Sequence, residues 1–229
     1  MFLQVILFCM LMNSSKDDTM NLNYETMNER QYSWLALGDS YTIGESVNEN
    51  ERFPAQTITL LKAESLNFSE PHYIATTGWT TENLLDGIEQ RKQDGPFDIV
   101  SLLIGVNDQY QHMDTADYRK HFNECLEKAI GFAGDKKNRV FVLSIPDYSV
   151  TPFAANSDIT QIRTEIDEFN AINKAITLSY DISYIDITPL TREAENDTSL
   201  IAADGLHPSA KEYAKWAELL ATEIKAVLE

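Results

Sequence analysis

The stretch that decides the fold is SWLALGDSYT, residues 33–42, in which an apolar run passes directly into Gly-Asp-Ser. Short, nearly continuous apolar runs are typical of strands that are buried on both faces of a parallel sheet. Ser40 follows the expected strand 33–37, and open α/β sheets bind their ligands beyond the carboxyl ends of the strands. The stretch therefore predicts a buried first strand that places Ser40 at the ligand-binding edge of a sheet.

Four more short apolar runs follow along the chain, and stretches with helical spacing separate them. This alternation predicts repeated βα units, in which crossover helices cover both faces of a parallel sheet. The fold class is therefore α/β, with the three-layer α/β/α sandwich as the expected architecture and five parallel strands in the central sheet. The expected strands are 33–37, 73–76, 98–103, 140–144 and 183–187, and the expected helices are 54–63, 80–93, 118–132, 159–179 and 208–228.

Composition indicates one sizeable globular domain and excludes several classes of function. The 229 residues are 43% hydrophobic, and 18 Lys and Arg stand against 36 Asp and Glu, for a formal charge of −18. A strongly acidic chain repels phosphate backbones, so we expect no nucleic-acid partner. The two cysteines, Cys9 and Cys125, are too few for a zinc cluster or a CxxC motif, and Cys125 fits a buried helix face.

The N-terminal segment differs from the rest of the chain. Residues 2–12 contain one polar side chain, Gln4, which resembles the apolar region of a secretory signal, but no Lys or Arg precedes them. The run is also short for a transmembrane helix. We expect residues 1–28 to be an apolar segment with a polar linker, a signal or membrane anchor, and residues 29–229 to be the folded domain. Export or membrane tethering is the expectation, and a cytoplasmic chain that starts at a later methionine is the alternative.

A serine hydroxyl needs an adjacent base to act as a nucleophile, and the sequence offers His207 in the run ADGLHPS, residues 203–209. Pro208 disfavours helical geometry at the residue before it, which places His207 in the turn that opens the last helix. Asp204 lies three residues earlier, so its carboxylate can accept from one imidazole nitrogen while the other takes the Ser40 proton.

Two loops offer donors for the oxyanion that forms during acyl transfer. TGWT, residues 77–80, follows the second expected strand, and Gly78 lets a backbone N–H approach a substrate closely. GVND, residues 105–108, follows the third expected strand and places the Asn107 amide at the same edge of the sheet. Either loop alone is equally consistent with a plain turn, but together with Ser40 they indicate a site for acyl transfer.

Several other polar residues are secondary candidates. Asp186, near the end of the fifth expected strand, is an alternative partner for His207. Asp39 is expected to organise its own turn, and Asp108 to support the neighbouring loop. The remaining histidines lack an acidic partner in a turn and are expected to be structural or exposed: His72, His112 and His121.

In order along the chain, the blocks around Ser40, Gly78, Asn107 and His207 resemble those that name the SGNH hydrolases, also called GDSL lipases and esterases. The resemblance spans nearly everything after the linker and makes residues 29–229 the SGNH hydrolase domain. It implies a flavodoxin-like five-stranded sheet of order 2-1-3-4-5 and a Ser-His-Asp mechanism without metal or cofactor. Carried over residue by residue, it implies Ser40 as nucleophile, His207 as general base, Asp204 as the orienting acid, and oxyanion donors from Ser40, Gly78 and Asn107.

The expected reaction is hydrolysis of a small-molecule carboxylic ester, by a small esterase or a lysophospholipase-like enzyme. Alternatives on the same fold are a carbohydrate O-deacetylase and a thioesterase, and the non-enzyme alternative is a ligand-binding module on a flavodoxin-like sheet. A metal-dependent phosphoesterase lacks a spaced cluster of ligands in the sequence. The proline-rich loop 145–153 is the expected acyl or alcohol pocket, and no feature of the sequence indicates an oligomeric state.

Overall fold

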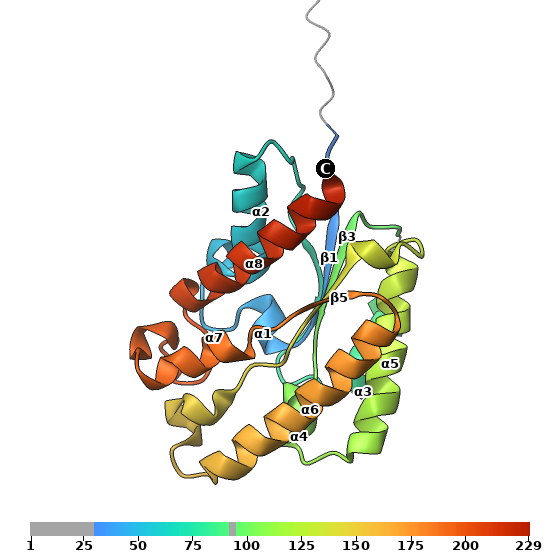
Figure 1. Cartoon of the computed structure of the whole chain (residues 1–229). Coiled ribbons are helices and arrows are strands. Elements are labelled where there is room, and N and C mark those ends of the chain that lie inside the picture. Colours follow the sequence, from blue (N-terminus) through green and yellow to red (C-terminus); the bar gives the residue numbers. More distant parts are fainter. Residues whose placement is uncertain (1–29, 92–94) are drawn as a thin grey trace, which may run out of the picture.

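The computed structural model describes residues 30–91 and 95–229. Over these residues five parallel strands form one sheet in the order β2-β1-β3-β4-β5, with helices on both faces (Figure 1). The three-layer sandwich and the strand order 2-1-3-4-5 are therefore confirmed. The expected segment 1–28, with Cys9, lies outside the described residues. The strands are β1 (Trp34–Gly38), β2 (His72–Ala75), β3 (Ile99–Leu103), β4 (Val140–Leu143) and β5 (Ser183–Ile185).

The three central strands explain the apolar runs in the sequence. Every residue of β1, β3 and β4 is buried, as expected where helices cover both faces of a parallel sheet. Gly38 at the end of β1 pairs with Ala75 on one side and with Leu103 on the other. The loops that follow β1, β2 and β3 therefore start from the same edge of the sheet.

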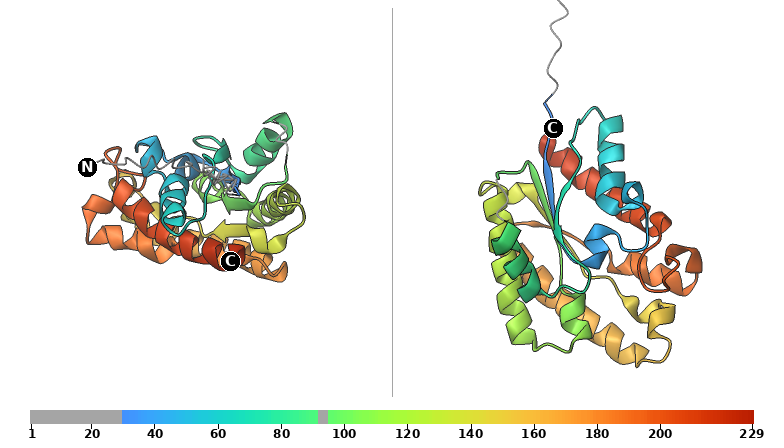
Figure 2. Two further views of the ribbon diagram at one scale, coloured as in Figure 1. Left: turned by 90° about the horizontal axis from the view of Figure 1, so that it is seen from above. Right: turned by 180° about the vertical axis from the view of Figure 1, so that it is seen from behind.

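Two groups of long helices cover the sheet. α2 (Phe53–Ala63) and α8 (Ala210–Leu228) pack together on one face, whereas α3 (Thr81–Arg91), α5 (Thr115–Phe132) and α6 (Ile159–Ser179) cover the other (Figure 1). The views in Figure 2 show α3 beside α5 on that second face. The C terminus lies at the amino ends of the strands, away from the edge where the loops meet (Figure 1). Within the described part of the chain, no helix has both the length and the apolar character needed to cross a membrane.

The last helix begins two residues later than its expected start at Pro208. Ser209 is the N-cap of α8, and its hydroxyl accepts from the Glu212 amide. Pro208 instead forms an isolated bridge with Ile201 and keeps the chain extended before the cap. A serine cap satisfies a helix amide that a proline cannot, and this favours the later start.

Short helices were not expected, because one turn is too short to show a periodic pattern. Two of them carry candidate site residues, α1 (Ser40–Ile43) and α4 (Val106–Tyr110). The others are α7 (Thr188–Arg192) and the 3-10 helices η1 (Glu49–Glu51), η2 (Lys137–Arg139), η3 (Tyr148–Val150), η4 (Pro152–Ala154), η5 (Glu193–Glu195) and η6 (Thr198–Leu200). Cys125 is fully buried on α5, as the sequence indicated.

Candidate active site

Ser40 lies where β1 turns into α1 and is only 4% exposed. Asp39 caps this short helix, and its carboxylate accepts from the Tyr41 amide at 2.9 Å. A Cβ at Gly38 would overlap the Leu103 carbonyl, so a glycine is needed where the turn packs against β3. The tight turn fixes Ser40 at the carboxyl edge of the sheet.

His207 and Asp204 form a close pair in the turn before α8. The two closest atoms, His207 Nδ1 and Asp204 Oδ2, are 2.6 Å apart. The other carboxylate oxygen, Oδ1, accepts from the backbone amides of Leu206 and His207 at 3.0 Å each. Tyr41 packs against the imidazole with 5.0 Å between ring centroids. The His207 ring is therefore held in one orientation by the carboxylate and by an aromatic neighbour.

The hydrogen bonds around Asp204 stabilise its ionised form. Partial burial by itself raises the pKa of this carboxyl, but the His207 ring, the backbone amide of Leu206 and the Ser46 hydroxyl outweigh that effect and hold its pKa well below the ordinary range. A carboxylate that stays ionised can stabilise an imidazolium formed beside it.

Asp186, the alternative partner for His207, lies elsewhere. It is exposed, and its carboxylate accepts from the Ser144 hydroxyl at 3.2 Å. Of the two candidates, the structure brings Asp204 to His207. The His112 side chain is 73% exposed, His72 is also exposed, and His121 is half-buried.

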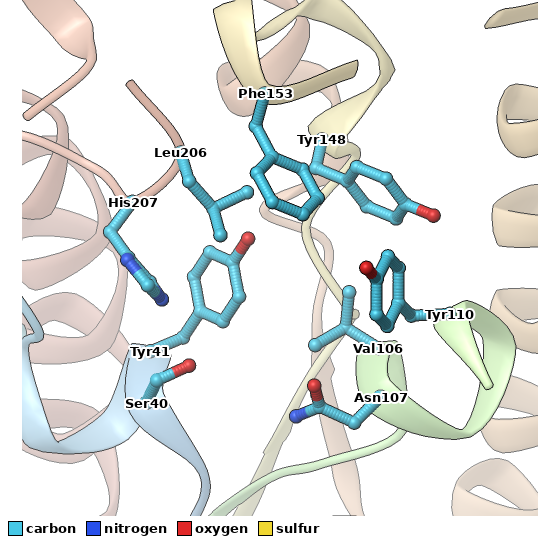
Figure 3. A pocket seen from close by; sticks show the side chains of 9 residues that line it. All are labelled: Ser40, Tyr41, Val106, Asn107, Tyr110, Tyr148, Phe153, Leu206 and His207. Carbon is cyan, nitrogen blue, oxygen red and sulfur yellow. The ribbon is translucent and has the colours of Figure 1, made fainter. Parts of the chain in front are cut away.

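Asn107 lies on α4, directly after β3. Gly105 caps α4 with φ of 127°, a backbone conformation that favours glycine, and a Cβ there would lie 2.6 Å from the Tyr118 hydroxyl. The Asn107 side-chain amide donates to the Trp79 carbonyl at 3.0 Å and, more weakly, to Asp39 Oδ2 at 3.4 Å. These contacts orient the amide nitrogen toward the side of the cavity where Ser40 lies (Figure 3).

Two carboxyls next to the site, those of Asp39 and Asp108, are buried. Burial raises the pKa of Asp39 to about 8. Asp108 accepts from the Thr81 amide at 2.9 Å and from the Thr81 hydroxyl at 2.5 Å, and burial raises the pKa of Asp108. Asp39 thus organises its own turn and Asp108 supports the start of α3, in agreement with the sequence interpretation of both.

Ser40, Asn107 and His207 line one cavity that is open to solvent (Figure 3). No hydrogen bond joins the Ser40 hydroxyl to the imidazole in the described structure. Catalytic hydrogen bonds often become short only once substrate is bound, so the lack of this hydrogen bond without substrate is compatible with proton transfer from Ser40 to His207. The rest of the lining is apolar or aromatic: Tyr41, Val106, Tyr110, Tyr148, Phe153 and Leu206.

Gly78 lies outside the cavity lining, whereas the sequence predicted that its backbone N–H approaches the substrate. It is exposed, has φ of 80°, and is not among the residues that line the cavity. A Cβ at this position would meet nothing within 4 Å, so the left-handed backbone rather than crowding favours glycine here. Its loop reaches the site through the Trp79 carbonyl, which accepts from Asn107.

Three aromatic side chains form one side of the cavity, and we call them the aromatic trio: Tyr110, Tyr148 and Phe153. Their ring centroids lie 5.8 to 6.2 Å apart. Tyr110 is 51% exposed and Phe153 is 48% exposed. The expected loop 145–153 supplies two of the three rings. Sequence reasoning missed Tyr110, although its place three residues after Asn107 puts both on one face of α4.

Among residues 30–91 and 95–229, no group of three or more His, Cys, Asp and Glu side chains is arranged to hold a metal ion. A serine, an oriented histidine and an amide donor at one cavity are the components of acyl transfer.

The family model described as the GDSL-like lipase/acylhydrolase family matches residues 36–215. The chain belongs to the GDSL-like lipase/acylhydrolase family. The matched span contains Ser40, Gly78, Asn107 and His207.

This GDSL-like chain resembles known proteins in sequence and in fold. It is 27% identical over 184 residues to a multidomain esterase from Ruminococcus flavefaciens, covering 72% of this chain and 22% of that protein. The chain therefore spans much less than the full length of that relative. Similar solved structures include the lipase Lip_vut3 from a goat rumen metagenome, with a TM-score of 0.66 and 22% identity over 84% of this chain and 97% of the other. A variant of Axe2, an acetyl xylan esterase from Geobacillus stearothermophilus, gives a TM-score of 0.60 and 19% identity over 84% and 94%. These structural likenesses show a shared fold.

Proposed function

We propose that this GDSL-like hydrolase cleaves carboxylic esters of small molecules through an acyl-enzyme intermediate, within a catalytic domain that spans residues 29–229. Ser40 is the nucleophile, His207 the general base and Asp204 the acid that orients His207. One observation carries the proposal: Ser40 and His207 open into the same cavity, while Asp204 occupies the Nδ1 side of the imidazole at 2.6 Å. The Nε2 side then remains available for the serine proton.

In the first half of the reaction, the Ser40 hydroxyl oxygen attacks the acyl carbon as Nε2 of His207 accepts its proton. The ionised Asp204 stabilises the imidazolium that results. When the tetrahedral intermediate collapses, the imidazolium gives its proton to the departing alcohol oxygen. The acyl group remains bound to Ser40 as an ester.

The negative charge of the tetrahedral intermediate needs donors that are already in place. Asn107 fits this role because the Trp79 carbonyl fixes its amide, while the second amide hydrogen, held only weakly by Asp39 Oδ2 at 3.4 Å, can turn to the substrate. The backbone N–H of Ser40 is the second donor. The backbone N–H of Gly78 is the third, and it requires the substrate to lie toward the exposed loop after β2.

In the second half, water attacks the acyl carbon while His207 takes its proton, and Ser40 leaves with that proton restored. The carboxylic acid product then dissociates. Both halves use the same side chains, so no further group has to be supplied.

The lining of the cavity favours a neutral substrate. Outside the three polar groups it is apolar or aromatic, and the chain carries a formal charge of −18 that repels anions. The aromatic trio offers ring faces to an apolar acyl or alcohol group. A small esterase therefore fits the site better than an enzyme for anionic esters.

The test is hydrolysis of p-nitrophenyl esters of increasing chain length at neutral pH with chelator present. Ser40→Ala and His207→Ala are each expected to lower kcat by about a thousandfold or more. His112→Ala, in which an exposed histidine is removed, serves as the matched control and should retain activity. Equal rates for wild type and Ser40→Ala would show that Ser40 is not the nucleophile. If wild type hydrolyses no ester at all, including acetylated sugars and thioesters, a ligand-binding role replaces the proposed one.

A further inference from the structure

The loop that follows the nucleophile helix contacts the acid of the pair. The Ser46 hydroxyl donates to Asp204 Oδ2 at 2.7 Å, and this oxygen is the one that lies 2.6 Å from His207 Nδ1. Ser46 and Asp204 are 158 positions apart in the sequence. A single hydrogen bond therefore connects the segment that carries Ser40 with the turn that carries His207.

The backbone of Ser46 is unusual for a serine. Its φ is 66°, in the left-handed region that glycine and asparagine occupy most easily. Backbone conformations of this kind persist in residues with a Cβ when surrounding interactions hold them. The turn is held by the amide of Glu45, which donates to the Ser40 carbonyl at 3.0 Å, and by that of Val47, which donates to Gly44 at 3.3 Å. The conformation directs the Ser46 hydroxyl to Asp204.

The loop has a second anchor on its other side. Glu45 Oε2 accepts from the Thr77 hydroxyl at 2.5 Å, and Thr77 belongs to the loop after β2. Consecutive residues of one turn thus bind the loop that contains Gly78 and the turn that contains Asp204. Two anchors at neighbouring positions limit the rotation of the turn.

We propose that Ser46 is a positioning residue for the reaction, which holds Asp204 Oδ2 in line with Nδ1 of His207. The inference rests on the proposed roles of Ser40, His207 and Asp204. The two oxygens of the carboxylate are held differently: Oδ1 accepts backbone amides of its own turn, whereas Oδ2 accepts from Ser46 and faces His207. Without the Ser46 hydroxyl, Oδ2 is held by the imidazole alone among the described residues.

Loss of the Ser46 donor should shift the pH dependence of the reaction in one direction. The carboxylate keeps more negative charge on the oxygen that faces Nδ1, which favours the imidazolium. The acid limb of the kcat/KM profile should then move to higher pH. Ser46 is exposed, so water replaces part of the lost hydrogen bond, and a decrease in kcat of about 3- to 10-fold corresponds to a single hydrogen bond of ordinary strength.

The other ionisable groups around Asp204 and His207 are unchanged in every Ser46 variant. Tyr41 from α1 and Tyr213 from α8 interact electrostatically with Asp204, and Asp147 and Glu212 line a small cavity beside His207. A shift of the profile can therefore be assigned to the removed hydroxyl.

The experiment compares Ser46→Gly, Ser46→Ala and Ser46→Asn in the full chain with p-nitrophenyl acetate. Glycine removes the hydroxyl and suits the left-handed backbone, so Ser46→Gly should lose about 3- to 10-fold in kcat and shift the acid limb upward without a fall in Tm. Asparagine tolerates the same backbone and supplies an amide donor. Ser46→Asn should therefore recover at least part of the lost kcat and reverse at least part of the shift of the acid limb. Ser46→Ala should lose as much activity as Ser46→Gly and have a lower Tm.

A wild-type rate and a wild-type pH profile in Ser46→Gly would overturn the inference, as would equal losses in Ser46→Gly and Ser46→Asn. Ser40→Ala is measured in parallel. If Ser40→Ala is inactive while the Ser46 variants match wild type, only the role of Ser46 fails. If Ser40→Ala is as active as wild type, the proposed function itself fails.

Discussion

The side-chain amide of Asn107 donates to the backbone carbonyl of Trp79 at 3.0 Å, which joins the loop after β3 to the loop after β2. The same amide nitrogen lies 3.4 Å from Asp39 Oδ2, in the residue that caps the helix of Ser40. Three loops from neighbouring strands therefore meet at one asparagine. A side chain with this many fixed partners needs little rearrangement when charge develops on a bound ester.

Replacing Asn107 should slow the chemical step more than it weakens binding. Asn107→Ala removes one proposed oxyanion donor, and loss of one such donor lowers kcat by about 100- to 1000-fold. KM should change little, because the donor acts mainly on the transition state. Steady-state kinetics with p-nitrophenyl acetate provide the check. Gln111→Ala, an exposed position at the end of the same helix, is the control, and an equal effect of both substitutions would contradict the role of Asn107.

The buried carboxyl of Asp39 should make stability depend on pH. Its pKa is raised by burial to about 8 from the ordinary 3.8, so between these values the folded protein keeps a proton that the unfolded chain releases. The stabilisation is complete below the unfolded pKa and is lost as the pH rises through about 8. Asp39→Asn cannot titrate, so the Tm of wild type should fall relative to this variant from about pH 5 to pH 8. Thermal unfolding at five pH values tests this, and parallel curves for the two proteins would exclude a raised pKa at Asp39.

The exposed ring of Phe153 should contribute to binding of longer substrates. Phe153→Ala removes one member of the aromatic trio, so KM for p-nitrophenyl esters with long acyl chains should rise by about 3- to 30-fold through lost apolar contact. The acetate ester, which is too small to cover the ring, should be affected little. Ile159→Ala is the matched control, because Ile159 is 45% exposed but does not line the cavity. Equal KM changes for short and long chains would argue against contact between Phe153 and the acyl group.

Two glycine substitutions should have opposite effects on stability. At Gly105, φ is 127° and a Cβ would lie 2.6 Å from the Tyr118 hydroxyl, so Gly105→Ala should lower the free energy of unfolding by about 2 to 4 kcal/mol through strain and crowding. Gly131 lies in α5, where a Cβ meets nothing within 4 Å, so Gly131→Ala should raise it by about 0.5 to 1 kcal/mol. Urea unfolding measures both. If Gly105→Ala is as stable as wild type, the loop before Asn107 is less constrained than its packing indicates.

Much of the fold can be predicted from the sequence because its repeating elements have local signatures. Buried parallel strands are continuous apolar runs, and the long helices carry apolar side chains at regular spacing. The helix 159–179 has the predicted bounds, and the strand 140–144 differs from the structure by one residue. The predicted start of α8 was wrong by two residues, because Ser209 rather than the residue before Pro208 is the N-cap of this helix.

The sequence by itself determined the α/β class, the five strands and the placement of Ser40, Asn107 and His207 after strands or before a helix, all of which depend on short-range pattern. The tertiary structure decided which residues meet. It placed Asp204 rather than Asp186 beside His207, left Gly78 outside the cavity lining, and brought the aromatic trio together. It also revealed the contact between Ser46 and Asp204. Loop conformations of this kind depend on contacts between residues far apart in the chain, and periodicity carries no information about such contacts.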